Sequence, residues 1–282
     1  MLLSNYHTHT FFCDGVDAPE AYVAFALKNN MHSLGFSAHA PVPFPCNWPL
    51  PIERLEEYIA TINGLKEKFS QQLQIYTGLE IDYIPNLWPE MKGRIKPGRF
   101  DFTIGSIHFV DTYEDGTPWT IDGNNKDFLH GLNTIFNNNS QEVFRRYFAY
   151  TREMVRVMKP TIIGHIDKLK MQYYNSAINP AEDKVYQHEF MSTLEEIAAT
   201  TCIVEINTRG IYRRNEKEYY PGLWAMRAMA DLKIKVTVNS DSHRPTELIS
   251  HWNEANAMLK EAGFKSVQIL RKGKWEDQEI EL

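Results

Sequence analysis

The chain has 282 residues, 43% of them hydrophobic, and a formal charge of −6 at pH 7, which is enough apolar sequence for one barrel-sized domain or two smaller ones. It has no apolar run near the roughly 20 residues that span a bilayer, and no basic segment followed by an apolar one at its start, so we expect neither a membrane partner nor a signal peptide. Its acidic balance without a long Lys/Arg run argues against nucleic acid as a partner, and its three widely spaced cysteines favour a cytoplasmic protein over a disulfide-bonded one.

Short apolar strands alternate with longer helical stretches along the chain. The first half predicts strands over residues 2–6, 32–38, 73–84 and 100–110, and helices over residues 18–29 and 52–69. Asp17 is the expected N-cap of the first helix, and Pro19 lies in its first turn. The second half predicts strands over residues 161–165, 202–208, 235–241 and 266–270, and helices over residues 141–159, 181–201, 220–232 and about 252–262.

This alternation predicts a parallel sheet with right-handed crossovers, and seven or eight such units favour an α/β barrel over an open sheet. No G-x-G-x-x-G or P-loop follows a strand, which removes the main reason to expect a nucleotide-binding fold. No domain boundary is evident, so we expect one domain over residues 1–282. The least regular stretch, residues 111–140, is either a surface insertion or a lid over the site.

Polar side chains recur at or near the carboxyl ends of the predicted strands, where parallel barrels carry their active sites. His7 and His9 are one residue apart in HTHT, so an extended segment points both imidazoles to the same face. The later strands contribute His39, Glu80, His108, His165, Asp241 and His243. One histidine after a strand is more often packed or exposed than a ligand, but eight such residues on one rim are hard to attribute to chance. The remaining four histidines lack this placement, and we expect them to be structural or surface residues: His32, His130, His188 and His251.

Imidazoles and carboxylates without thiolates suit zinc, iron or manganese. With Asp14, which follows HTHT closely, the rim offers nine donors: His7, His9, Asp14, His39, Glu80, His108, His165, Asp241 and His243. One ion takes about four to six ligands, so we expect two or three divalent ions with Glu80 as a bridging carboxylate. The excess positive charge of such a cluster favours an anionic substrate. Cys13 is interpreted as a bystander, because a soft sulfur is unusual in a set of nitrogen and oxygen ligands.

These motifs resemble the polymerase and histidinol phosphatase superfamily of metal-dependent phosphoesterases. The matching segments occur in the family's order over nearly the whole chain: HTHT (7–10), SAHAP (37–41), GLEID (78–82), GSIHF (105–109), GHID (164–167) and SDSH (240–243). The longer segment RFDFTIGSIHF, followed by W-T-I-D at 119–122, is similar to the stand-alone histidinol-phosphate phosphatase branch.

The resemblance implies a distorted, TIM-like (β/α)7 barrel with three metal ions. By position, the first ion would be held by His7, His9, Glu80 and Asp241. The second would be held by Glu80, His108 and His165, and the third by Asp14, His39 and His243. Many relatives have a histidine where this chain has Asp14, so the third site is the least secure part of this assignment.

The resemblance also implies an activity, the hydrolysis of L-histidinol phosphate to L-histidinol and phosphate in histidine biosynthesis. A metal-bridging water, its pKa lowered towards about 7, would attack phosphorus in line. Asp241, His243 or a water on the third ion would protonate the departing alkoxide. Lys170, Arg213 and Arg244 are candidates to bind the phosphate.

Three alternatives remain open from the sequence. Another phosphoesterase of the same superfamily would act on a nucleotide or on phosphotyrosine. A metal-dependent amidohydrolase also begins with His-x-His, but here the carboxylate lies on the third strand and the last motif is Asp-Ser-His. A degenerate barrel without activity would be expected to lose ligands, whereas this chain keeps a full set. The sequence is compatible with a homo-oligomer and does not decide the metals.

Overall fold

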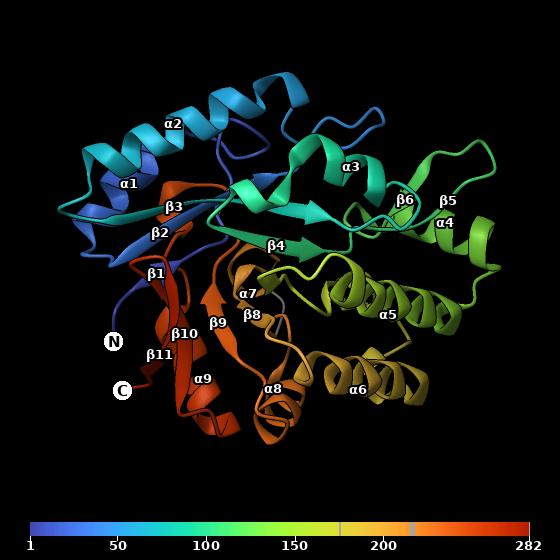
Figure 1. Ribbon diagram of the computed structural model, residues 1–282. Coiled ribbons are helices and arrows are strands. Elements are labelled where there is room, and N and C mark those ends of the chain that lie inside the picture. The colour runs from blue at the N-terminus through green and yellow to red at the C-terminus, as the bar shows by residue number, and fades with distance from the viewer. Residues whose placement is uncertain (175, 215–217, 282) are drawn as a thin grey trace.

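The computed structural model of the protein describes residues 1–174, 176–214 and 218–281. Seven parallel strands form its main sheet in the order β1-β2-β3-β4-β7-β8-β9. Their bounds are Ser4–Asn5, Ser33–His39, Gln74–Asp82, Phe102–Ser106, Ile162–Ile163, Ile203–Asn207 and Val236–Asn239. A parallel bridge between Thr8 and Ser242 links the two edges. The sheet is therefore nearly closed, and the prediction of a distorted (β/α)7 barrel in a single domain is confirmed (Figure 1).

Helices cover the outside of this barrel (Figure 1). They are α1 (Pro19–Lys28), α2 (Leu55–Lys68), α3 (Trp88–Ile95), α4 (Asn125–Phe136), α5 (Ser140–Val157), α6 (Lys184–Ala198), α7 (Arg209–Arg214), α8 (Leu223–Asp231) and α9 (Trp252–Ala262). Single 3₁₀ turns occur at Ile52–Arg54, Pro97–Arg99, Pro180–Glu182 and Pro245–Glu247, and a longer one, η3, runs over Lys168–Tyr173. The expected cap Asp17 is wrong, because α1 begins after Ala18 without a side-chain cap, although Pro19 occupies its first turn as predicted. No helix in the described part of the chain is long and apolar enough to cross a membrane.

A C-terminal hairpin covers the amino end of the barrel. It consists of β10 (Ser266–Arg271) and β11 (Lys274–Glu279), which pair antiparallel outside the main sheet. Leu270 and Trp275 pack on apolar side chains from the first half of the strands, among them Tyr6, Tyr76 and Phe102. The hydroxyl of Tyr6 accepts the backbone N–H of Leu270 at 2.7 Å. With its amino end filled in this way, the barrel has its opposite, carboxyl end available for a site.

The stretch 111–140, predicted to be irregular, is largely ordered. A short hairpin of β5 (Phe109–Thr112) and β6 (Pro118–Thr120) leads into α4, which Asn124 caps by accepting the N–H of Asp127 at 2.9 Å. Trp119 is buried against this helix, where a Cβ at Gly131 would collide with the indole ring. The segment is therefore packed on α4, and it remains a prediction whether it acts as a lid.

One predicted strand, 100–110, is in fact two. β4 ends at Ser106 and β5 begins at Phe109, so His108 lies in the break between them. The backbone N–H of His108 donates to the side chain of Asp82 at 3.2 Å instead of to a neighbouring strand. Leaving the sheet at this point turns the chain outward and brings His108 to the carboxyl end of the barrel.

Candidate active site

The carboxyl ends of the strands bring all nine predicted metal-ligand candidates into one region. Their nitrogen and oxygen atoms form four overlapping groups, within each of which the atoms lie within 4.8 Å of one another. The groups are His7/Glu80/His165, His7/His9/Asp241, His39/Glu80/His108 and His9/Asp14/His39/His243. Because the groups share residues, they form a single cluster that offers more ligands than one ion takes.

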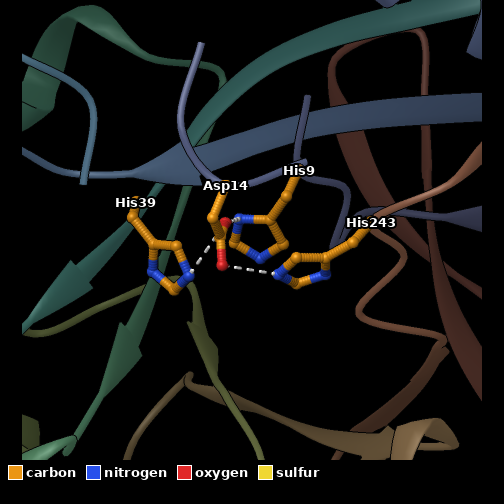
Figure 2. A group of neighbouring side chains, drawn as sticks. All are labelled: His9, Asp14, His39 and His243. Atoms are coloured by element: carbon orange, nitrogen blue, oxygen red, sulfur yellow. Dashed lines mark hydrogen bonds and ion pairs between the residues drawn. The ribbon is translucent and has the colours of Figure 1, made fainter. Parts of the chain in front are cut away.

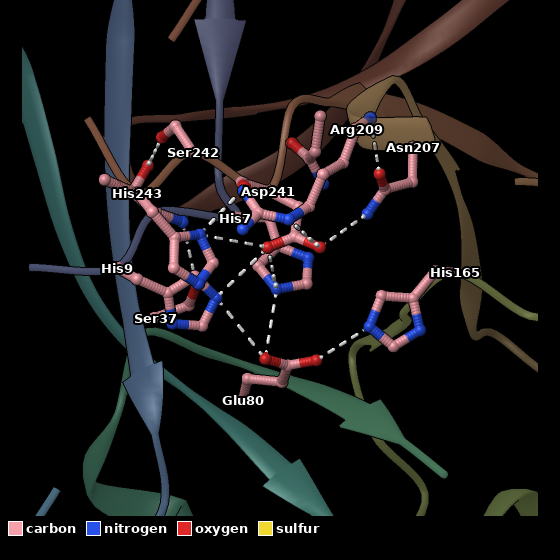
Figure 3. Close-up of polar contacts among 12 residues, drawn as sticks. His7, His9, Ser37, Glu80, His165, Asn207, Arg209, Asp241, Ser242 and His243 are labelled. Carbon is pink, nitrogen blue, oxygen red and sulfur yellow. Dashed lines mark hydrogen bonds and ion pairs between the residues drawn. The ribbon is translucent and has the colours of Figure 1, made fainter. Parts of the chain in front are cut away.

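Glu80, on β3, belongs to two of the four groups, and Figure 3 shows its carboxylate facing the imidazoles of His7, His9 and His165. Its side chain is 1% exposed, and its carboxylate faces five imidazoles. The distances from Glu80 Oε2 are 3.1 Å to His7 Nε2, 3.4 Å to His9 Nε2 and 3.0 Å to His39 Nδ1, and those from Oε1 are 3.0 Å to His165 Nε2 and 3.9 Å to His108 Nε2. Burial alone would raise the pKa of Glu80, but the surrounding imidazoles, led by His7, lower it well below its usual range. Glu80 is therefore ionised and in position to bridge two ions.

Several buried atoms of the cluster have no hydrogen-bond partner among the described residues. They include His7 Nε2, His9 Nε2, His39 Nδ1 and Glu80 Oε2. The three nitrogens converge on the one oxygen at the distances given above. Buried polar atoms in proteins are nearly always hydrogen-bonded, so a convergent set without such bonds fits metal ligation. The donor types, imidazole nitrogen and carboxylate oxygen, suit zinc, iron or manganese.

Asp14 joins the cluster at its more exposed side (Figure 2). Its Oδ2 lies 3.0 Å from His243 Nε2, and its Oδ1 lies 3.7 Å from His39 Nε2 and 3.8 Å from His9 Nδ1. The side chain is 34% exposed, in contrast to 1% for Glu80. Neighbouring Cys13 is a poor ligand, because burial and the charge of Asp14 raise the pKa of its thiol to about 12. An aspartate in this exposed position is expected to hold its ion less tightly than the buried groups hold theirs.

Two carboxylates orient candidate ligand histidines by accepting a hydrogen bond from the ring nitrogen that faces away from the cluster. Glu205 on β8 is fully buried, and its Oε1 accepts from His7 Nδ1 at 2.7 Å. Asp82 at the end of β3 accepts from His108 Nδ1 at 2.8 Å. Each contact fixes the proton on Nδ1 and leaves Nε2 directed at the cluster, as is usual for metal-binding histidines. Neither carboxylate was identified from the sequence, although a glutamate inside the apolar run IVEIN is itself a signal of a buried polar role.

Glu205→Gln is expected to weaken metal binding about 10- to 100-fold, because the carboxylate that orients His7 is lost while the side-chain volume is kept. The measurement is zinc affinity by competition with a chromophoric chelator. Glu153→Gln is the matched control, since Glu153 lies on α5 and accepts from Tyr83 Oη at 2.9 Å. Equal zinc affinity in the two variants would show that Glu205 does not orient a ligand.

Asp241, two residues after the end of β9, has an unusual backbone. Its φ is 51°, a left-handed conformation that is rare outside glycine and is often found at functional sites. Its carbonyl oxygen accepts from Arg209 Nη1 at 2.7 Å and from Tyr212 Oη at 3.2 Å. This conformation directs Oδ1 to within 3.4 Å of His9 Nε2 and 3.7 Å of His7 Nε2. Arg209 and Tyr212, on the short helix α7, thus hold the turn that places a ligand.

The three predicted phosphate-binding cations lie outside the four groups. Lys170 Nζ contacts Tyr219 O at 2.6 Å, Asp167 Oδ2 at 3.0 Å and Glu218 Oε2 at 3.3 Å. Arg213 and Arg244 are exposed. Their role remains a prediction. A cation that the sequence reading missed, Lys168, lies at the cluster instead.

Lys168 is the first residue of η3 and is almost fully buried. Its Nζ donates to His108 Nε2 at 3.3 Å and forms an ion pair with Asp122 Oδ2 at 2.7 Å. Burial opposes its charge, but the nearby carboxylates, Asp122 first, outweigh burial and raise the pKa of Lys168 above its ordinary value. The site therefore contains an ammonium group beside its carboxylates and imidazoles.

The fold and this site define a class of protein, a parallel barrel that gathers imidazoles and carboxylates for several metal ions at the carboxyl end of its strands. The sequence matches the PHP domain family over residues 5–209, and the chain belongs to that family.

Curated relatives match over most of their length. A probable histidinol-phosphatase of Deinococcus radiodurans is 27% identical over 268 residues, which cover 94% of this chain and 95% of the relative. The histidinol-phosphatase of Bacillus subtilis is 27% identical over 251 residues, 84% of this chain and 92% of the relative.

Two solved structures share the fold. The putative histidinol phosphatase of Listeria monocytogenes superimposes with a TM-score of 0.78 at 21% identity, over 89% of this chain and 99% of that one. The histidinol phosphate phosphatase of Lactococcus lactis, in complex with zinc, L-histidinol and phosphate, gives a TM-score of 0.74 at 22% identity, over 97% of this chain and 98% of that one.

Proposed function

We propose that the chain is a metal-dependent phosphomonoesterase that hydrolyses L-histidinol phosphate to L-histidinol and phosphate. The observation that carries the proposal is the convergence of nine imidazole and carboxylate side chains, most of them buried, into one cluster at the carboxyl end of the barrel. The substrate is supported by the names of the relatives from D. radiodurans and B. subtilis. It is supported as well by the small molecules bound in the L. lactis structure.

The cluster offers more ligands than one ion takes, and we propose two or three ions, of zinc, iron or manganese. His7, His9, Glu80 and Asp241 would hold the first; Glu80, His108 and His165 the second; and Asp14, His39 and His243 the third. Ions bound there would supply Lewis acidity and lower the pKa of water, giving a nucleophile at neutral pH. Glu80 links the first two sets, because its two oxygens face different histidines.

Asp241 and His243 were both predicted to protonate the leaving alkoxide, but only one of them is suited to give up a proton. The pKa of Asp241 would rise with burial, but His7 and Arg209 lower it well below its usual range, so the carboxylate carries no proton to give. His243 lies beside it, with Nδ1 3.6 Å from Asp241 Oδ1, and is accessible from the exposed side of the cluster. We therefore assign the proton transfer to His243 if the third site holds no ion, and to a water on the third ion if His243 Nε2 serves as a ligand there.

Two aromatic side chains beside the cluster, Trp48 and Phe109, could pack against a leaving group that contains an aromatic ring. Trp48 packs edge-on to His39 and His108, with ring centroids 4.4 and 5.7 Å apart, and stacks on Phe109 at 5.8 Å. Aromatic rings prefer such edge-on and stacked neighbours. If the phosphate of histidinol phosphate binds at the cluster, we expect its imidazole ring to lie near Trp48 and Phe109.

The test is a panel of phosphate monoesters, assayed with metal analysis on the same sample. We expect histidinol phosphate to have a higher kcat/KM than nucleoside monophosphates or phosphotyrosine peptides. Faster turnover of a nucleotide or a phosphotyrosine peptide would show that the chain is a different phosphoesterase of the family.

We also propose that the protein works in the cytoplasm. Its three cysteines, Cys13, Cys46 and Cys202, are all free. Free, partly buried thiols are typical of a reducing compartment, which agrees with a role in amino-acid biosynthesis.

A further inference from the structure

Lys168 is a buried cation beside the metal-ligand candidates, but an ammonium group cannot itself bind a metal ion. Its side chain is 7% exposed and lies against the cluster, although the cluster already contains several imidazoles. Burying an ammonium group is costly unless anions compensate it. The carboxylates that offset its charge are Asp122, in the ion pair, and the metal-ligand candidates Asp241 and Glu80. Metal ions bound by Asp241 and Glu80 would draw on these two carboxylates and leave the ammonium group able to bind a further anion.

The hydrogen-bond donors of Lys168 are not all committed to the protein. An ammonium group has three donors, and the described contacts of Nζ are Asp122 Oδ2 and His108 Nε2. The second contact competes with metal binding, because Asp82 occupies His108 Nδ1 and leaves Nε2 as the ligand atom. When Nε2 binds an ion, its lone pair is no longer available to Lys168, and more of the ammonium group is free to bind a ligand.

Lys170, two residues later, provides the contrast. Its Nζ has three acceptors, Tyr219 O, Asp167 Oδ2 and Glu218 Oε2, at 2.6 to 3.3 Å. Three acceptors match its three donors, and none of them belongs to the metal-ligand candidates. On η3, the lysine directed at the cluster is therefore Lys168.

We propose that Lys168 binds the phosphoryl oxygens of the substrate and that Asp122, through its ion pair, positions the ammonium group. The proposal rests on the proposed function for the identity of the anion. Charge-assisted hydrogen bonds from an ammonium group hold a phosphate and offset the charge on its oxygens during in-line attack. Lys168 forms no covalent bond with the substrate.

Lys168→Met tests the first part, with inorganic phosphate as the probe. In the zinc-loaded protein, we expect the affinity for phosphate, measured by calorimetry, to fall about 10- to 100-fold, as for the loss of a hydrogen bond between charged groups. We also expect the KM for histidinol phosphate to rise and the zinc content to stay unchanged. Lys168→Arg should recover part of the lost phosphate affinity. Lys66→Met is the control, because Lys66 pairs with Asp101 on the outside of the barrel.

The competing assignment is tested in the same experiment. Phosphate affinity that is unchanged in Lys168→Met, or that falls in Lys170→Met instead, overturns the proposal. A loss of zinc from Lys168→Met also overturns it, because the lysine would then support the metal ligands. Phosphate binding does not depend on which monoester is the substrate, so the result stands apart from the substrate panel.

Asp122 is tested by a double-mutant cycle. If Asp122 acts by positioning Lys168, then Asp122→Asn weakens phosphate binding in the wild-type background and has no further effect in Lys168→Met. A structural role for Asp122 would give the same loss in both backgrounds. Additive losses would therefore refute the positioning role while leaving Lys168 as the phosphate-binding residue.

Discussion

Glu80→Ala is expected to give a folded protein with no measurable turnover and with less than half of the metal that the wild type binds. Glu80 faces five imidazoles with its two oxygens, so its removal takes a ligand from more than one ion at once. The fold is expected to survive. Against the effect of burial, Glu205 and then Glu80 raise the pKa of His7 well above its usual value, and Glu80 leads the carboxylates that raise the pKa of His39 to about 9. Without Glu80, both imidazoles are therefore more readily neutral, and His7 keeps its contact with Glu205. Elemental analysis and circular dichroism measure the two effects.

Asp14→Ala tests whether the loss of metal depends on how deeply the ligand is buried. Asp14 is partly exposed and belongs to one of the four groups, whereas Glu80 is buried and belongs to two. Asp14→Ala should therefore lose less metal than Glu80→Ala, and Glu153→Ala on α5 should lose none. Equal losses from Asp14→Ala and Glu80→Ala would show that the site of Asp14 is as tight as the buried ones.

The alternation of strands and helices made the barrel predictable, because the core strands are continuous apolar runs and parallel strands share one carboxyl end. The same rule predicts from the sequence that His7, Glu80 and Asp241 lie close together. Their distances did not follow from it. The left-handed turn at Asp241, for example, depends on Arg209 and Tyr212, which lie about thirty residues earlier in the chain.

The residues that the sequence reading missed support the cluster from outside it. Glu205 and Asp82 lie within strands, where a strand pattern gives no reason to connect them with a particular histidine. Lys168 was passed over for Lys170, because the phase of the short 3₁₀ turn η3 decides which of two nearby lysines faces inward. Asp122 belonged to a segment expected to be irregular. Contacts of this kind depend on three-dimensional packing between distant segments, which periodicity does not encode.

Removing the metal is expected to abolish activity without unfolding the barrel. The large apolar core is built from strands and helices around the whole circumference, and the hairpin cluster at the amino end is separate from the ligands. Far-UV circular dichroism should therefore stay native-like after chelation and gel filtration. An ion that binds only the native state stabilises it by about 2.7 kcal/mol at 100 times Kd, so the loss of each such ion should lower the Tm by roughly 5 °C in a chain of this size.

Reconstitution separates loss of metal from damage by the chelator. Zinc, manganese and iron added back one at a time should each restore both the Tm and some turnover, and the ion that restores most of the activity identifies the functional metal. Chelator already saturated with zinc serves as the control. Full activity in a preparation shown by elemental analysis to be metal-free would refute the metal-dependent mechanism. The cluster would then have to act through its side chains alone, with the carboxylate of Asp241 or the imidazole of His243 as the nucleophile that attacks phosphorus.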